Sequence, residues 1–260
     1  MFLLVDIGLY GDGTTKIVVT NVAQPLATLL LQQCAQRQRG GQEGGGGVAI
    51  VPEWSGFDTV KPVHEITTEQ HPEQADAGRV EVTSDPDVVR QADRIVLPGD
   101  GAFPACAAEL RGHKGIYEAM VEAVEQKGRP FLGICVGMQL MATTGHEYEE
   151  TPGLNWVAGD VQRIVPADRA LKVPHMGWND LVIERAHPVL DGVVTGDHTY
   201  FVHSYQFHVD TPDERIAHVD YGGDVTAIIG RDTMLGMQFH PEKSQAVGLR
   251  MIGNFLRWMP

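Results

Sequence analysis

Short apolar runs alternate with segments of helical spacing along much of this 260-residue chain. From residue 80 onward the alternation is regular, and apolar runs at residues 80–83, 94–97 and 130–134 are each followed by a helical pattern. Strands separated by helices favour a parallel sheet, because a parallel pair needs a long crossover connection. The sequence therefore predicts an α/β fold in which helices flank a mainly parallel central sheet.

The helices expected in this part of the chain cover residues 85–91, 104–110, 116–125 and 136–143. After residue 150 the sequence is richer in strands, which predicts an additional antiparallel portion in the C-terminal half. Those strands are expected over residues 161–165, 181–184, 200–209, 215–219, 225–229 and 234–239. A last amphipathic helix is expected over residues 244–258, with its inward side chains at Val247, Met251, Ile252 and Phe255.

The first part of the chain follows this pattern less well. We expect strands at residues 2–7 and 16–20, a helix at 25–38, a brief apolar run at 48–51 and loop over 52–78. Residues 39–47 (RGGQEGGGG) have the composition of a flexible linker. The prediction is a single domain over residues 1–260, whose N-terminal segment 1–79 is atypical and carries a flexible Gly-rich stretch at 39–47.

Composition and charge argue against several classes of function. The formal net charge is −14, which disfavours nucleic acid and anionic membrane surfaces as partners. No run of 18 or more apolar residues predicts a membrane-spanning helix, and the first residues lack the basic start of a signal peptide. Three scattered cysteines predict neither a disulfide scaffold nor a zinc site. We expect a cytoplasmic protein without a metal or cofactor.

Cys135 lies at a predicted corner between a strand and a helix, within residues 129–139 (RPFLGICVGMQ). A thiolate at such a corner meets the unpaired N–H groups and the positive dipole end of the helix, and both favour negative charge. Gly133 and Gly137 would let neighbouring backbone approach, as in nucleophile elbows built on serine. The amide of Val136 would point toward a developing oxyanion. The alternative is a buried structural cysteine.

His240 and Glu242 follow the predicted strand at residues 234–239. Pro241 favours extended backbone at His240, and the carboxylate of Glu242 could hold one imidazole nitrogen and so select the tautomer. A lone cysteine at an elbow and a His-x-Glu pair together have the sequence form of a Cys-His-Glu triad. The alternative for this segment is a surface His-Pro-Glu turn.

Other segments could complete a site around these residues. In residues 98–103 (PGDGAF), Gly99 and Gly101 could turn backbone N–H groups toward a substrate carbonyl, although an ordinary tight turn would look the same. Residues 172–179 and 200–205 are rich in histidine and aromatic residues. Their histidines, His175 and His203, either line a pocket or are hydrogen-bonded core residues.

Taken together, these motifs resemble a known family. The chain resembles the class I glutamine amidotransferases of the triad type and, more narrowly, the glutaminase subunit of imidazole glycerol phosphate synthase. The resemblance covers residues 80–258, where the motifs occur in the order of the family. They are residues 97–103 (LPGDGAF), 133–140 (GICVGMQL), 174–179 (PHMGWN), 200–205 (YFVHSY) and 236–244 (GMQFHPEKS). The string at residues 174–179 is the feature that narrows the resemblance to this subunit.

The resemblance implies a flavodoxin-like fold and a glutaminase mechanism. Cys135 would attack the side-chain amide of glutamine, His240 would relay the proton that releases ammonia, and Glu242 would orient His240. The oxyanion hole and the site for the amino-acid end of glutamine would be formed by Gly99, Gly101, Val136, Gln139, Ser204 and Tyr205. No cofactor and no metal are implied.

The resemblance also implies a partner. In the family, ammonia passes to a cyclase subunit with a (β/α)8 barrel, and the two subunits form a heterodimer that acts in histidine synthesis. Trp178, Asn179 and Lys243 would then lie toward the interface. Two other interpretations stay open at this point: the glutaminase subunit of another biosynthetic amidotransferase, and an impaired regulatory or binding homologue.

The chain departs from the family pattern at two places. The turn at residues 6–12 is one residue longer than the corresponding tight turn of the family, and unfamiliar sequence follows it up to residue 80. Asp100 occupies a loop position where the family often has an apolar residue, and a carboxylate beside an oxyanion hole opposes negative charge there. We expect a chain that keeps the triad but has altered activation.

Overall fold

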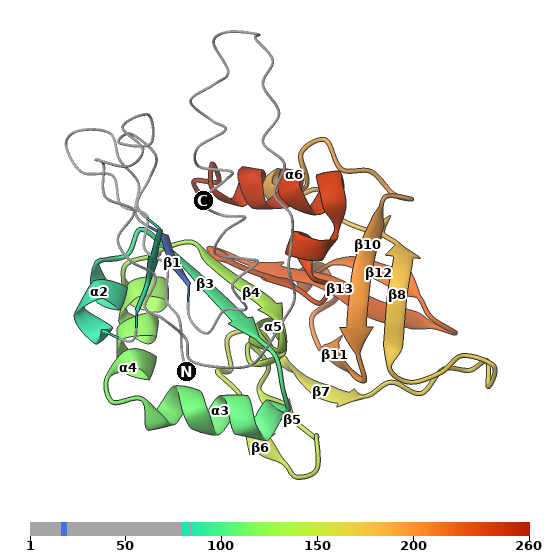
Figure 1. Cartoon of the computed structure of the whole chain (residues 1–260), viewed down its shortest axis with the longest axis horizontal. Helices are drawn as coiled ribbons and strands as arrows, with labels where there is room; N and C mark the ends of the chain where they lie inside the picture. Colours follow the sequence, from blue (N-terminus) through green and yellow to red (C-terminus); the bar gives the residue numbers. More distant parts are fainter. Residues whose placement is uncertain (1–16, 20–79, 84) are drawn as a thin grey trace, which may run out of the picture.

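The computed structural model describes residues 17–19, 80–83 and 85–260 (Figure 1). The expected strand at residues 2–7, the helix at 25–38, the flexible stretch at 39–47, the run at 48–51 and the loop at 52–78 lie outside the described residues. The expected strand at residues 16–20 is present as β1, Ile17–Val19. The single domain over residues 1–260 therefore stays a prediction.

The centre of the fold is an eight-stranded mixed sheet in the order β2-β1-β3-β4-β14-β13-β12-β9 (Figure 1). The pairs from β2 to β14 are parallel, and the pairs from β14 to β9 are antiparallel. The strands not yet given are β2 Val80–Val82, β3 Arg94–Gly99, β4 Phe131–Cys135, β9 Val182–Ile183, β12 Arg215–Asp220, β13 Asp224–Arg231 and β14 Met234–Met237. The predicted parallel sheet with an antiparallel C-terminal portion is confirmed.

Two smaller sheets accompany the central sheet. One pairs β10 with β8, and the other has the order β11-β7-β5-β6. Their strands are β5 Thr144–Gly145, β6 Thr151–Pro152, β7 Gly159–Arg163, β8 His175–Asp180, β10 His198–His203 and β11 Tyr205–Val209. The single strand predicted over residues 200–209 is wrong, because the chain leaves one sheet and enters the other at Ser204. Apolar residues alternate through both strands, so the sequence pattern does not indicate where the first strand ends and the second begins.

Helices pack on both faces of the central sheet, with α6 on one side and α3 and α4 on the other (Figure 1). They are α2 Pro86–Gln91, α3 Phe103–Gly112, α4 Ile116–Val121, the π-turn η3 Glu122–Gln126, α5 Val136–Gln139 and α6 Gln245–Phe255, with short 3₁₀ turns η4 Pro188–Leu190, η5 Pro212–Glu214 and η6 Pro241–Lys243. Helix α2 begins as its sequence predicts, because Asp85 caps the Asp87 N–H and Pro86 occupies the first turn.

Helix α5 ends at Gln139, although the sequence predicted a helix to residue 143. The reason is a set of hydrogen bonds to segments distant in the sequence. The carbonyls of Leu140 and Ala142 accept hydrogen bonds from the N–H groups of Leu154 and Asn155, at 2.7 Å and 2.9 Å. The N–H of Thr143 donates to the Gly159 carbonyl at 3.0 Å, not to the Gln139 carbonyl that a continued helix would use, and the chain enters the β5–β6 hairpin.

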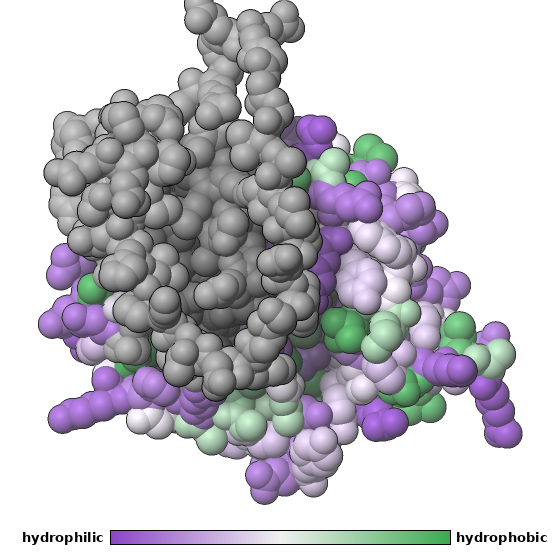
Figure 2. Space-filling view, viewed as in Figure 1, coloured by the Kyte–Doolittle hydropathy of each residue, from purple (hydrophilic) through white to green (hydrophobic). Residues whose placement is uncertain are grey.

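The hydrophobic core lies on both faces of the central sheet. Every residue of β4 is buried, and so are the first four residues of β3, as expected of parallel strands covered by helices on both sides. In Figure 2 the described surface shows hydrophobic side chains scattered among hydrophilic ones. Among the helices in the described ranges, none is long and apolar enough to cross a membrane.

Gly248 allows helix α6 to pack against the 3₁₀ turn η6, which carries Glu242. A Cβ atom at Gly248 would lie 1.9 Å from the carbonyl oxygen of Pro241, so the backbone would have to move. By contrast, a Cβ at Gly112, the last residue of α3, meets nothing within 4 Å. The two glycines therefore form a matched pair for testing how closely α6 must approach η6.

We predict that Gly248→Ala destabilises the protein by about 1–3 kcal/mol. The added methyl group would clash with backbone, which cannot move aside as a flexible side chain can. Gly112→Ala is expected to leave stability unchanged or to raise it by up to about 1 kcal/mol, as alanine favours a helix. Urea unfolding followed by circular dichroism measures both changes. Equal effects from the two substitutions would contradict the close packing of α6 on η6.

Candidate active site

The candidate site lies where three parallel strands of the central sheet end. Gly99, at the end of β3, pairs with Cys135, at the end of β4. On the other side of β4, Met237 of β14 pairs with Ile134, so the chain that follows β14 carries His240 back toward the thiol. The carboxyl ends of parallel strands meet at one edge of a sheet, which is where α/β proteins place their ligands.

Cys135 sits in a strained backbone conformation, with φ 55° and ψ −115°. Such a conformation in a residue other than glycine is typical of a nucleophile elbow. Neighbouring glycines make the corner possible. A Cβ at Gly133 would lie 2.6 Å from the carbonyl oxygen of Gly137, and a Cβ at Gly137 would lie 1.7 Å from the carbonyl oxygen of Leu97. The elbow is thus held against β3 by contacts that only glycine allows.

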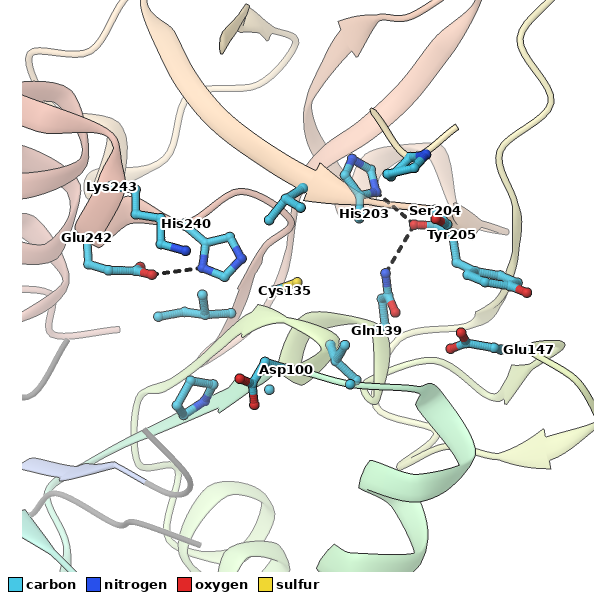
Figure 3. A pocket seen from close by; sticks show the side chains of 17 residues that line it. Asp100, Cys135, Gln139, Glu147, His203, Ser204, Tyr205, His240, Glu242 and Lys243 are labelled. Carbon is cyan, nitrogen blue, oxygen red and sulfur yellow. Dashed lines mark hydrogen bonds and ion pairs between the residues drawn. The ribbon is translucent and has the colours of Figure 1, made fainter. Parts of the chain in front are cut away.

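His240 lies between Glu242 and Cys135 (Figure 3). Its Nδ1 is 2.8 Å from Oε1 of Glu242, and because a carboxylate only accepts, Nδ1 carries the hydrogen and donates. Burial by itself lowers the pKa of His240, but the hydrogen bonds and charges of Cys135 and Glu242 outweigh it and raise that pKa to about 9. The imidazole is therefore held as a cation beside the sulfur.

Backbone contacts with β10 fix the position of His240. The His240 N–H donates to the Tyr200 carbonyl at 3.0 Å. Ser244, which is fully buried, accepts from the Tyr200 N–H at 3.0 Å and donates to the His240 carbonyl at 2.7 Å. The loop that carries the imidazole is thus attached to a neighbouring strand as well as to its own.

Two buried glutamines line the other side of the thiol. The Gln139 side-chain amide donates to the Tyr205 carbonyl at 3.1 Å and to Oε1 of Gln238 at 3.0 Å. The Gln238 amide in turn lies 3.8 Å from the Cys135 sulfur. Sequence reasoning missed Gln238, although it lies within the quoted motif at residues 236–244. The sequence feature that could have indicated Gln238 is a polar residue at the end of an otherwise apolar predicted strand.

A cavity of about 440 Å³ opens over the thiol, a volume within the range of small-molecule sites. Every catalytic and substrate-binding residue predicted from the sequence lines it: Gly99, Gly101, Cys135, Val136, Gln139, Ser204, Tyr205, His240 and Glu242. The structure therefore brings these residues together at one site (Figure 3). His203 lines the same cavity, whereas His175 is buried behind it.

Glu147 is a cavity residue that the sequence did not reveal. Its carboxylate accepts the N–H of Phe103, the first residue of α3, at 2.7 Å. The residue at the N-cap position, Ala102, has no side chain that could do this. A carboxylate from a distant hairpin therefore caps α3, which cannot be seen in the local sequence of either segment.

Asp100 also lines the cavity, at its exposed edge. Its carbonyl lies 3.8 Å from the sulfur of Cys106, a buried thiol beneath the loop. Burial first, and then the charges of Asp100 and Glu109, raise the pKa of Cys106 to about 11. Cys106 is therefore a protonated thiol at neutral pH.

One group among the described residues has side chains close enough together to hold a metal ion. Glu184, His218 and Asp224 offer ligand atoms within 4.8 Å of one another. However, Arg215 lies 2.7 Å from Glu184 and 3.3 Å from Asp224, so its guanidinium already supplies positive charge there. The group is a partly exposed network of ion pairs between β12, β13 and the end of β9, and none of its members lines the cavity.

Comparison with known proteins assigns the family. The family model described as glutamine amidotransferase class-I matches residues 69–258. The chain belongs to this family. The resemblance inferred from the motifs is thereby confirmed, and with it the prediction that the chain is an enzyme of the glutamine amidotransferase class.

Curated relatives support the narrower resemblance. The imidazole glycerol phosphate synthase subunit HisH of Ruegeria pomeroyi is 80% identical over 184 residues, which cover 71% of this chain and 87% of that relative. The HisH subunit of Cereibacter sphaeroides is 64% identical over 184 residues, which again cover 71% of this chain and 87% of that relative. Among solved structures, a glutamine amidotransferase matches with a TM-score of 0.52 and 20% identity, over 67% of this chain and 83% of its own. That likeness supports the fold.

The two buried cysteines of the described chain should differ in reactivity. We predict that iodoacetamide at pH 7.5 alkylates Cys135 at least about tenfold faster than Cys106, because the raised pKa of Cys106 leaves almost no thiolate. His240→Ala should slow the alkylation of Cys135 and leave Cys106 unchanged. Mass spectrometry of the separate peptides measures both rates. Equal labelling of the two thiols would contradict this account of the site.

Proposed function

We propose that this chain hydrolyses glutamine to glutamate and ammonia at the Cys135 cavity, as the glutaminase subunit of an imidazole glycerol phosphate synthase. The observation that carries the proposal is the meeting of Cys135, His240 and Glu242 at one cavity, in a chain 80% identical to a HisH subunit. The proposed role of each residue follows from its contacts.

In the proposed first half-reaction, the Cys135 thiolate attacks the side-chain carbonyl carbon of glutamine. The new carbon–sulfur bond places a negative charge on the amide oxygen. The His240 imidazolium then gives its proton to the amide nitrogen, the carbon–nitrogen bond breaks, and ammonia leaves. Glu242 accepts the Nδ1 hydrogen throughout, which keeps the imidazole aligned and stabilises its positive charge.

In the second half-reaction, neutral His240 takes a proton from a water molecule, and the resulting hydroxide attacks the glutamyl thioester. The carbon–sulfur bond breaks, glutamate is released, and the thiolate–imidazolium pair is restored. The same imidazole thus acts as acid and then as base. Its raised pKa suits the first role, because it is fully protonated when glutamine arrives.

The oxyanion would be held by backbone N–H groups. Val136 opens α5, so its N–H has no partner within that helix, and the Gly99–Gly101 loop lies opposite. A Cβ at Gly99 would lie 2.9 Å from Cβ of Val136, so glycine is needed for the two segments to approach. The exposed carboxylate of Asp100 beside this loop would oppose the oxyanion and so lower activity in the absence of a partner.

The amino-acid end of glutamine would lie at the opposite end of the cavity. There, Gln139 and the backbone of Ser204 and Tyr205 supply hydrogen-bonding groups. Glu147 adds a carboxylate that complements the positive charge of an α-amino group (Figure 3). We assign substrate recognition to these residues because a free amino acid presents this pattern of charges.

The proposed partner is a cyclase subunit with a (β/α)8 barrel, to which ammonia would pass. Met176 and Trp178 on β8 are apolar yet 60% and 48% exposed, and the Trp178 ring contacts that of Tyr200 at 5.7 Å between centroids. Exposed large apolar side chains that project side by side from one strand are typical of an interaction surface. Exposed Lys243 at the cavity would also belong to this interface, whereas the Asn179 side chain lies on the other face of β8 and contacts His175.

Glutamine hydrolysis by the purified chain tests the proposal. We expect low activity alone and stimulation of at least about tenfold by a histidine-pathway cyclase subunit with its nucleotide ligand bound, since allosteric coupling energies of about 1–3 kcal/mol correspond to such factors. Cys135→Ala should abolish both activities. No hydrolysis in either condition by the folded protein would support the impaired homologue instead. Stimulation equal to that of a relative without an acidic residue at this loop position would contradict altered activation.

The pH profile tests the role of Glu242. We expect kcat/KM for glutamine to fall above about pH 9 as the His240 imidazolium loses its proton. Glu242→Gln removes a negative charge that favours the imidazolium, which lowers the pKa of His240 and should move this basic limb to lower pH by about one unit or more. Glu184→Gln changes another glutamate that contacts a histidine, His218, outside the cavity. The pH profile of Glu184→Gln should match that of the wild type. Equal shifts in both variants would refute the role assigned to Glu242.

A further inference from the structure

A line of hydrogen bonds continues behind the cavity from the Tyr205 carbonyl toward the surface. His203 Nδ1 lies 2.8 Å from the Tyr205 carbonyl oxygen. Behind it, Nδ1 of His175 lies 3.1 Å from Nε2 of His203. The side-chain nitrogen of Asn179 lies 3.3 Å from Nε2 of His175. Both histidines are buried, and the mechanism proposed above uses neither of them.

The partners at the two ends determine which nitrogens carry hydrogen. A carbonyl only accepts, so Nδ1 of His203 must donate to Tyr205, and Nε2 of the neutral ring must accept. His175 must then donate from Nδ1 and accept at Nε2 from the Asn179 amide. The orientation of Asn179 is fixed independently, because its oxygen accepts from the Asp180 N–H and its nitrogen donates to the Asp220 carbonyl. In each hydrogen bond of the line, the hydrogen is therefore donated in the direction of Tyr205.

The line is stable because both rings stay neutral. Burial lowers the pKa of His175 to about 4. Burial, with the positive charge of nearby His240, lowers the pKa of His203 to about 3 despite the bond to Tyr205. A proton on either ring would place two N–H groups face to face. Neither ring is protonated at neutral pH, so the direction of the hydrogen bonds along the line does not change.

The Tyr205 carbonyl receives hydrogen bonds from two sides. His203 donates to it from behind, and Gln139 donates to it from the elbow side, as the dashed lines in Figure 3 show. A carbonyl has two lone pairs, so both are used. These two donors, together with the Ile164 N–H that donates to the Ser204 carbonyl at 2.9 Å, therefore hold the Ser204–Tyr205 backbone where the chain passes from β10 to β11.

We propose that His203, and His175 behind it, are positioning residues for glutamine. They hold the Ser204–Tyr205 backbone in the geometry that binds the amino-acid end of the substrate, and they take no part in proton transfer to or from it. The inference rests on the proposed function, since it assigns that backbone to glutamine. It requires that loss of the donor at His175 weakens substrate binding and leaves the chemical step nearly unchanged.

The packing of His175 makes a clean test possible. Its ring stacks on Phe201, with centroids 4.7 Å apart and planes 20° apart, and lies 4.0 Å from the Tyr221 ring. His175→Phe keeps an aromatic ring in this stack but removes the donor, which leaves Nε2 of His203 without a partner. His175→Asn keeps an N–H donor near the position of Nδ1 and loses the ring. The two variants therefore separate the hydrogen bond from the packing.

The experiment measures kcat and KM for glutamine under the conditions in which the wild type is active. We expect His175→Phe to raise KM roughly fivefold or more, because His203 loses the bond that holds its donor on the Tyr205 carbonyl, with kcat within about twofold of the wild type. His175→Asn should restore KM to within about twofold. A matched control is His187→Phe, at another histidine that contacts an aromatic ring, Trp258, outside the cavity. It should leave KM unchanged.

The outcomes separate the two proposals. Wild-type hydrolysis with an unchanged KM in His175→Phe, or a KM that rises equally in His175→Asn, would overturn the positioning role and leave the proposed function standing. Calorimetric titration of glutamine into Cys135→Ala, with and without His175→Phe, measures binding without turnover. A wild type that does not hydrolyse glutamine, together with a Cys135→Ala protein that does not bind it, would overturn both proposals.

Discussion

The contact between the Cys135 elbow and the backbone of β3 is the constraint on which the candidate site depends. The chain turns sharply after β4, and the turn fits only because Gly137 lets the elbow approach the Leu97 carbonyl. This contact holds the strained conformation of Cys135 and places Gly99 beside it. Strain of this kind costs of order 1–3 kcal/mol, and it persists only where the surrounding structure enforces it. Here β3 and β14 enforce it from both sides.

Two polar arrangements then meet at the sulfur, and they differ in charge. On one side, Glu242 and His240 form a charged pair whose imidazole keeps its proton to about pH 9. On the other side, the glutamines and the buried histidines form a neutral network that ends on the Tyr205 carbonyl. The charged side suits proton transfer, because its protonation can change during the reaction. The neutral side suits recognition, because burial keeps its protonation constant.

Much of the fold and of the site follows from local patterns. The glycines at the elbow, the proline after His240 and the apolar runs each report a local backbone requirement, and these were predicted correctly. The end of α5, the change of sheet at Ser204 and the cap supplied by Glu147 were not predicted. In each case the deciding hydrogen bond joins segments distant in the sequence, so the residues involved carry no local signal.

By itself, the sequence determined the α/β class, the position of the thiol at a strand-to-helix corner and the family to which the chain belongs. These depend on residue types at short spacing, which local sterics and periodicity control. Only the tertiary structure decided that His240 reaches Cys135, that Gln238 contacts the sulfur and Glu147 lines the cavity, and that two buried histidines support Tyr205. Those facts follow from strand order and register, which depend on how distant segments share one hydrophobic core.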